Sequence, residues 1–154
     1  MSVSVDIQIA SECQGIPPSE QFTQWATAAV YGHKAIAELS IRVVDETESA
    51  ELNFAYRQKH GPTNVLSFPA ELPEAVELPL LGDLAICAPV VFREAAEQNK
   101  SLEAHWAHMV IHGTLHLLGF DHINDKDAEI MESLETKILM ELDYPNPYQP
   151  SESL

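Results

Sequence analysis

Hydrophobic and polar residues alternate at the start of the chain, and this pattern predicts a half-buried strand over residues 3–9. Aliphatic side chains at every second position share one face there, because successive strand residues point to opposite faces. Short apolar runs predict three further strands, at 39–44, 65–68 and 80–87. Gly82 and Asp83 interrupt the last of these runs.

Apolar residues three and four positions apart predict five helices along the rest of the chain. Asp45 followed by Glu48 resembles a capping box before the second helix, and Gly119 follows the fourth in the usual C-cap position. Prolines indicate that residues 69–79 and the tail from Tyr144 lie on the surface. The five helices run from Ser19 to near Gly32, after Asp45 through Tyr56, from Pro89 to Gln98, from Ser101 to Leu118, and from Asn124 or Asp125 through Leu139.

The order of these elements predicts an α/β fold of the mixed α+β kind, with a small mixed sheet packed against about five helices. A length of 154 residues fits a single domain spanning 1–154. Hydrophobic residues make up 45% of the chain and charged residues 21%, which argues against disorder and against a low-complexity filament.

The chain is strongly acidic, and this excludes one way of binding nucleic acid. Its 8 basic and 24 acidic residues give a net charge of −16 with histidine neutral. A coat protein that binds by bulk positive charge is excluded, whereas a local basic groove is not. Cys13 and Cys87 are too few for a disulfide scaffold. Without a leader or an apolar run of about 18 residues, we expect a soluble, cytoplasmic protein that does not enter a membrane.

Three histidines near the end of the fourth predicted helix have the spacing of a metal site. His112 and His116 are four residues apart and project from one helix face. Gly119 then ends the helix, so that the chain can fold back and bring His122 towards the same point. The pattern His-x3-His-x2-Gly-x2-His is the three-histidine zinc arrangement of the long metzincin motif.

Such a set of ligands favours a catalytic site over a structural one. Three neutral imidazoles at about 2.0–2.1 Å leave a fourth tetrahedral position for water. A single histidine would more simply cap or pack a helix end, but three at this spacing favour a metal. The residue after His112 is Gly113 and not the glutamate that serves metalloproteases as general base. Peptidase activity is therefore disfavoured.

Three separate motifs resemble the YbeY family of bacterial endoribonucleases and ribosomal RNA maturation factors. They are His-Gly-Thr-Leu-His-Leu-Leu-Gly-Phe-Asp-His at 112–122, Pro-Thr-Asn-Val-Leu-Ser-Phe at 62–68 and Gly-Asp-Leu-Ala-Ile at 82–86. The resemblance covers nearly the whole chain. It implies a metal-dependent endoribonuclease specific for single strands, with one Zn²⁺ per chain bound by His112, His116 and His122. Histidine sites also accept other divalent transition metals, so the residues leave the native metal open.

The resemblance also implies a biological setting. The family acts in small-subunit (16S) ribosomal RNA maturation, ribosome biogenesis and ribosome quality control in the cytoplasm. The implied partners are ribosomal RNA, the small ribosomal subunit, ribosomal proteins and an assembly GTPase, whereas the oligomeric state stays open. Asn64 stands where many members have Asp, and Phe120 where many have Tyr. We therefore do not expect a carboxylate at 64 or a hydroxyl at 120 to carry the chemistry.

Arg57 is the candidate cation for the phosphate of the substrate. No acidic residue lies between Leu52 and Ala70, and arginine matches phosphate geometry well. The family resemblance also points to Arg57 as a functional arginine, so we count it with the three histidines as catalytic. An arbitrary arginine there would instead be a solvated charge at a helix end. Lys59 and His60 are more simply surface residues than phosphate contacts.

Several polar residues have two interpretations from the sequence. Asp121 has two interpretations. It would accept a hydrogen bond from the His122 ring, as carboxylates beside metal-bound histidines often do, or it would cap the following turn. Asp83 would orient a ligand histidine or, more simply, belong to a turn. His105 and His108 are best interpreted as satisfied histidines in the interior. Trp25 and Trp106 fit core packing better than base stacking. The glutamates of the last helix are best interpreted as a solvated face: Glu129, Glu132 and Glu135.

Two other functions remain open from the residues alone. One is a metallohydrolase of another substrate class, of which Gly113 disfavours the protease version. The other is a ribosome-assembly factor that only binds, with a structural metal. The charge of −16 adds an expectation for the nuclease: free RNA should bind weakly through a few phosphate contacts, and a ribosomal partner should position the strand.

Overall fold

The computed structural model describes residues 2–70, 79–121 and 123–148, and within them four strands form one mixed sheet. Its order is β1-β2-β4-β3, with the first three parallel and β3 antiparallel to β4. This confirms the mixed α/β fold. The strands are β1 (Ser2–Ala10), β2 (Ile36–Val44), β3 (Val65–Pro69) and β4 (Leu80–Cys87), and the helices are α1 (Ser19–Val30), α2 (Glu46–Arg57), α3 (Ala88–Glu97), α4 (Leu102–Leu117) and α5 (Asp125–Glu141).

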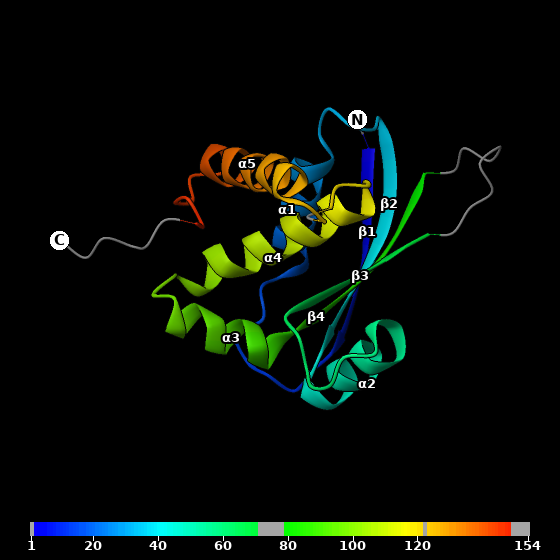
Figure 1. Cartoon of the computed structure of the whole chain (residues 1–154), viewed down its shortest axis with the longest axis vertical. Helices are drawn as coiled ribbons and strands as arrows, with labels where there is room; N and C mark the ends of the chain where they lie inside the picture. The colour runs from blue at the N-terminus through cyan, green and yellow to red at the C-terminus, as the bar shows by residue number, and fades with distance from the viewer. Residues whose placement is uncertain (1, 71–78, 122, 149–154) are drawn as a thin grey trace.

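One face of the sheet is covered by helices, as Figure 1 shows with α1, α4 and α5 to one side of the strands and α2 at the lower end. A row of paired residues crosses this face from β1 to β3. Ile7 is paired with Ile41, Ile41 with Leu84, and Leu84 with Ser67. The residues of this row are aliphatic on β1, β2 and β4, whereas the residue on the edge strand β3 is the hydroxyl-bearing Ser67. Most of the predicted loop at 69–79 falls in 71–78, outside the described residues.

The core lies between the sheet and helices α1 and α4. Phe22 stands edge-on to Trp25 and to Trp106, with ring centroids 5.8 Å and 5.6 Å apart. Both tryptophans are 0% exposed, which confirms the interpretation of core packing. Although α4 is buried along most of its length, neither it nor any other helix in the described ranges is long and apolar enough to cross a membrane.

Gly82 lies inside β4 and does not interrupt the strand, contrary to expectation. Leu81 is an extra residue opposite the Glu38–Leu39 step of β2, so the pairing shifts by one there. Gly82 has a φ of +139°, and a Cβ on it would lie 2.2 Å from the carbonyl oxygen of Phe68. Only glycine has the conformational freedom and the space that this close pairing of β3 and β4 requires.

Asp45 precedes α2 as predicted, but the capping box is not formed. The Asp45 carboxylate accepts hydrogen bonds from the Ser11 hydroxyl and, at 3.1 Å, from the Glu12 backbone N–H. These hydrogen bonds hold the pKa of Asp45 below its ordinary value. Glu48 instead accepts two hydrogen bonds from the Arg42 guanidinium, at 2.5 and 3.0 Å. Asp45 therefore bonds to the segment that follows β1 and Glu48 bonds to β2, and the Asp45 side chain does not cap the first turn of α2.

Candidate metal centre and substrate cleft

Four histidines form a continuous row along one face of α4. Spacings of three and four residues place His105, His108, His112 and His116 one turn apart, and neighbouring ring centroids lie 6.1, 6.2 and 4.7 Å from each other. The side chains of His105 and His108 are 2% and 8% exposed, whereas those of His112 and His116 are 23% and 20% exposed. The row therefore starts in the interior and opens at the C-terminal end of α4.

Gly119 ends α4 as predicted and turns the chain back towards the histidines. Its N–H donates to the His116 carbonyl at 3.0 Å, and the Phe120 N–H donates to the Leu115 carbonyl at 3.1 Å. This is the Schellman pair of hydrogen bonds, with Gly119 at a φ of +106°. The turn brings an Asp121 carboxylate oxygen to 3.9 Å from His116 Nδ1. The predicted partner of Asp121, His122, lies outside the described residues.

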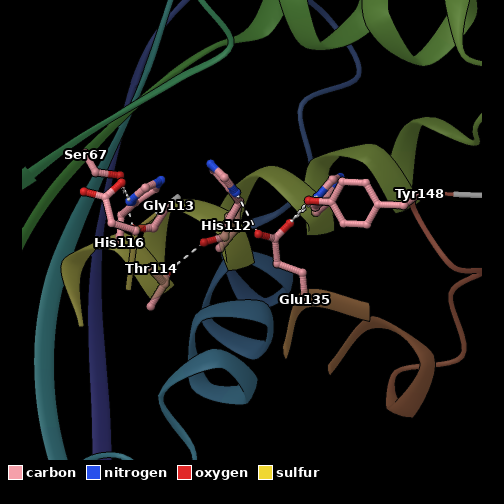
Figure 2. Close-up of polar contacts among 10 residues, drawn as sticks. Ser67, His112, Gly113, Thr114, His116, Glu135 and Tyr148 are labelled. Atoms are coloured by element: carbon pink, nitrogen blue, oxygen red, sulfur yellow. Dashed lines mark hydrogen bonds and ion pairs between the residues drawn. The ribbon is translucent and has the colours of Figure 1, made fainter. Parts of the chain in front are cut away.

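Glu135 joins two of these histidines from the facing helix α5. Its side chain is 0% exposed, with Oε1 2.6 Å from His108 Nε2 and Oε2 2.9 Å from His112 Nδ1. The Tyr148 hydroxyl also donates to Glu135, and Figure 2 shows Glu135 between His112 and Tyr148. The interpretation of Glu135 as part of a solvated face was therefore wrong.

The charges in this cluster follow from burial and hydrogen bonding. Burial alone would raise the pKa of Glu135, but the hydrogen bonds from His108 and His112 outweigh it and lower that pKa to about 2. Burial lowers the pKa of His108, against the opposing effect of Glu135. Burial and the carboxylate together raise the pKa of Tyr148. Glu135 is therefore an ionised acceptor, and His108 is a neutral ring whose Nε2 carries the donated proton.

The contact with Glu135 determines which nitrogen of His112 suits a metal. An ionised carboxylate only accepts, so His112 Nδ1 carries a hydrogen, which leaves Nε2 as the nitrogen that could face a metal. Histidine ligands of metals commonly donate their other N–H to a carboxylate in this way. Asp121 lies on the corresponding side of His116. The side chains present therefore fit a metal at the exposed end of the row.

Ligand atoms of His108, His112 and Glu135 also lie within 4.8 Å of one another, so this buried trio can itself hold a metal ion. Its present geometry is that of hydrogen bonds. The 2.6 Å between His108 Nε2 and Glu135 is shorter than the roughly 3.4 Å that separates two ligands at about 2.1 Å from a tetrahedral metal. Two donor sets thus share His112: the buried trio and the pair with His116.

His112 and His116 face a cleft of about 560 Å³ that also contains Arg57, the last residue of α2. The structure therefore brings together three of the four residues that the sequence singled out, although α2 and α4 are distant in the chain. Lys59 and His60 are exposed and do not line this cleft. The lining residues are Tyr56, Arg57, Thr63, Asn64, Val65, Leu66, Ser67, Pro69, His112, His116, Gly119, Phe120 and Asp121.

Gly113 allows α4 to approach the sheet at the floor of this cleft. A Cβ on it would lie 2.8 Å from a methyl group of Leu84 and 3.1 Å from one of Val65. Its carbonyl oxygen accepts a hydrogen bond of 3.1 Å from the Ser67 hydroxyl (Figure 2). The position that carries a general base in metalloproteases thus faces packed side chains here.

A sequence profile of the family described as Endoribonuclease YbeY matches residues 8–143, which is most of the chain. The chain belongs to the YbeY family. It is also similar to the solution structure of TM1509 from Thermotoga maritima, with a TM-score of 0.62 and 29% sequence identity, over 93% of this chain and 99% of that one. YbeY proteins are endoribonucleases and therefore hydrolases, and this membership supports a function in ribosomal RNA processing.

Asn64 takes part in a half-buried network of hydrogen bonds. Its amide donates to both carboxylate oxygens of Glu94 at 3.1 and 3.2 Å, and its own oxygen accepts from the Val65 N–H. His105 Nε2 lies 2.9 Å from the same carboxylate. Burial raises the pKa of Glu94, but the hydrogen bonds from His105 and Asn64 outweigh it and leave the pKa lowered. A second carboxylate at 64 would be repelled by Glu94, whereas the amide is a donor.

Asp83 is not among the residues that line the cleft of His112 and His116, and it lies in a strand and not in the turn that the sequence favoured. It lies in β4, where its carboxylate accepts a hydrogen bond from the Ser40 hydroxyl on β2. Phe120 lines the cleft and packs edge-on against His33, with ring centroids 5.4 Å apart. Neither position supplies an acid or a base to the cleft.

The sequence did contain a signal for Glu135 that spacing alone reveals. Glu135 lies four residues after Met131 and four before Leu139, both 1% exposed, and hence in the centre of the apolar stripe of α5. A carboxylate on the buried face of an amphipathic helix needs a partner, and a neighbouring helix with buried histidines supplies donors. The neighbouring Glu129 and Glu132 are exposed, as interpreted.

Proposed function

We propose that this chain is a zinc-dependent endoribonuclease specific for single-stranded RNA, acting in the maturation of small-subunit (16S) ribosomal RNA and in ribosome quality control. The observation that carries the proposal is the shared cleft: Arg57, His112 and His116 line one cavity in a chain of the YbeY family. We further propose a cytoplasmic location, with the small ribosomal subunit, ribosomal proteins and an assembly GTPase as partners.

His112, His116 and His122 are the proposed ligands of one Zn²⁺ per chain. When bound, zinc lowers the pKa of a water molecule and stabilises charge on a phosphoryl oxygen. Glu135 orients the His112 ring through the 2.9 Å hydrogen bond at Nδ1, and Asp121 is positioned to act on His116 in the same way. The buried row behind them, His108 with Glu135, keeps α4 and α5 in register at this point.

Arg57 is proposed to bind the phosphate that is cleaved. It ends α2 at the rim of the cleft, where its side chain is exposed and its planar guanidinium can donate two hydrogen bonds to phosphate oxygens. Asp121 is the one acidic side chain among the residues that line the cleft. The cation therefore acts where little negative charge opposes the approach of RNA.

Arg57→Glu tests this function, with Lys126→Glu as a control of equal charge change on the exposed surface of α5. We expect Arg57→Glu to abolish 16S ribosomal RNA processing while metal content and thermal stability stay at wild-type values. Arg57→Lys keeps the charge but loses the two-pronged geometry, so it should retain part of the activity. His116→Ala should lose both the metal and the activity.

Three results would contradict the proposal. Normal processing by Arg57→Glu would return this side chain to a solvated charge at a helix end. Full metal occupancy in His116→Ala, measured by elemental analysis, would remove the histidine assignment. If His116→Ala loses the metal but ribosomal RNA still matures, the metal has a structural function, and the protein is an assembly factor that binds without cleaving.

A further inference from the structure

The walls of the cleft come from parts of the chain that lack acidic residues. Although 24 of 154 residues are acidic, none occurs in 52–70 or in 104–120. Every lining residue except Asp121 belongs to one of these two stretches. The fold therefore joins two uncharged or basic segments into one cleft, and a polyanion meets little repulsion there despite the net charge of −16.

Two exposed aromatic side chains share the last turn of α2 with Arg57, and one of them, Tyr56, lines the cleft. Phe54 and Tyr56, in the last turn of α2, are 52% and 51% exposed. The Tyr56 ring rests against Phe68 of β3, with centroids 4.6 Å apart and planes tilted by 58°. Phe54 rests in the same way against His60, at 5.1 Å and 32°. Each exposed ring is thus held by a second ring, so little side-chain freedom remains to be lost when a planar ligand binds.

Tyr56 is suited to stacking in a way that the other described aromatic residues are not. Trp25 and Trp106 are 0% exposed, and the exposed rings of Tyr31 and Tyr148 do not line the cleft of the histidines. Phe120 lines the cleft but is half-buried. Tyr56 combines exposure, a place on the cleft wall and an adjacent cation.

The geometry points to a base-stacking site for single-stranded RNA, which we call the aromatic rim and define as Phe54, Tyr56, His60 and Phe68. Tyr56 stacks on the unpaired base next to the phosphate that Arg57 binds, and Phe54 contacts a base further along the strand. In a duplex the base faces are covered by neighbouring bases, so a stacking site selects unpaired strands. This inference rests on the proposed function and adds the surface that recognises the strand.

Binding of a short single-stranded RNA carrying one 2-aminopurine tests the aromatic rim, using the full-length metal-loaded protein while gels show the RNA to be intact. Stacking quenches the fluorescence of this base. Tyr56→Ala should weaken binding about 10-fold and abolish the quenching, because base–aromatic stacking is worth that much per base. Tyr56→Trp should retain both. Tyr31→Ala is the control, because Tyr31 is a more exposed tyrosine that does not line the cleft.

An RNA with an abasic nucleotide at the quenched position completes the test. It should bind the wild type about 10-fold more weakly, and Tyr56→Ala should bind it no worse than the wild type does. If the wild type binds and cleaves RNA but Tyr56→Ala behaves as Tyr31→Ala, the aromatic rim is wrong and the proposed function stands. If the wild type neither binds nor cleaves single-stranded RNA, both fall.

Discussion

At the scale of single residues, Glu135 is the side chain that orients one of the proposed metal ligands, His112. Glu135→Gln removes the charge that fixes the hydrogen on His112 Nδ1 while keeping the shape of the side chain. We expect the affinity for zinc to fall about 10- to 100-fold, as is usual when a carboxylate behind a metal-bound histidine is lost. Competition with a chromogenic chelator measures the dissociation constant.

Glu129→Gln is the matched control, because Glu129 is an exposed carboxylate on the same helix. It should leave zinc affinity unchanged. A complete loss of zinc from Glu135→Gln, together with retention in His116→Ala, would instead make the buried trio of His108, His112 and Glu135 the metal site.

The same carboxylate predicts how stability depends on pH. The pKa of Glu135 is lowered to about 2 in the folded protein, so its stabilisation is present above the unfolded value of 4.5 and is lost as the pH falls towards 2. The pKa of His108 is lowered below 6.5, so its contribution too is lost on acidification. Both groups therefore destabilise the folded state in acid.

Urea unfolding of metal-free protein checks this prediction. Relative to a His108→Leu/Glu135→Leu variant, the wild type should lose about 2 kcal/mol of its free energy of unfolding between pH 6.5 and pH 3. Because both proteins carry the remaining titratable groups, their common pH dependence cancels in the difference. A gap that is constant with pH would mean that these two groups do not titrate as the structure indicates.

Residues whose partners belong to other helices or strands are those that sequence patterns misassigned. The histidine spacing and Gly119 are local features of α4, and both the helix and its Schellman turn were predictable. Glu48 pairs with Arg42 and Glu135 with His108, contacts that depend on how elements pack. Local spacing reports helix geometry, whereas the choice among several possible partners is made by tertiary structure.

At the scale of elements, the pairing of β3 with β4 depends on Gly82. Gly82→Ala would place a Cβ 2.2 Å from the Phe68 carbonyl oxygen at a φ of +139°, so the backbone of one strand must move. We expect a loss of about 3–5 kcal/mol in the free energy of unfolding, measured with urea. The cleft would also be displaced, because β3 forms one of its walls.

Gly32→Ala separates the two causes of this loss. Gly32 also has a positive φ, of +86°, but nothing lies within 4 Å of its would-be Cβ. It should therefore cost only about 1–2 kcal/mol, from the backbone conformation alone. Equal losses for the two variants would show that the close approach of β3 and β4 contributes nothing.

The elements themselves were predictable because their patterns are periodic and local. Alternation gave the first strand and apolar spacing gave the helices, each within a few residues of the observed bounds. Gly82 was misinterpreted as an interruption because glycine breaks most strands. Here Gly82 lies in the bulged strand β4, which the neighbouring strand β3 approaches closely. β3 is antiparallel in an otherwise parallel sheet.

At the scale of the whole molecule, an acidic protein must bind RNA through a small surface. The proposed metal and Arg57 lie in the cleft and Lys59 lies outside it, so we expect two or three phosphate contacts in all. The logarithm of the binding constant should then fall with the logarithm of salt concentration with a slope of about −2. Titrations of a short single-stranded RNA across salt concentrations measure it.

If free RNA binds weakly, the small ribosomal subunit must supply the rest of the affinity for the strand. Adding them should raise the rate of cleavage at a defined site, and Arg57→Glu should abolish this rate with or without them. Tight binding to isolated RNA with a steep salt dependence would contradict this prediction. It would require a larger basic surface than the described residues form.

The close packing at Gly113 limits what this scaffold can become. Installing the glutamate of a peptidase there needs more than one substitution, because Leu84 and Val65 occupy the space that its side chain would enter. Both would have to shrink, or α4 would have to lift from the sheet and carry His112 and His116 with it. A laboratory evolution experiment that selects peptide hydrolysis from this protein should therefore recover changes at 65 and 84 before any at 113.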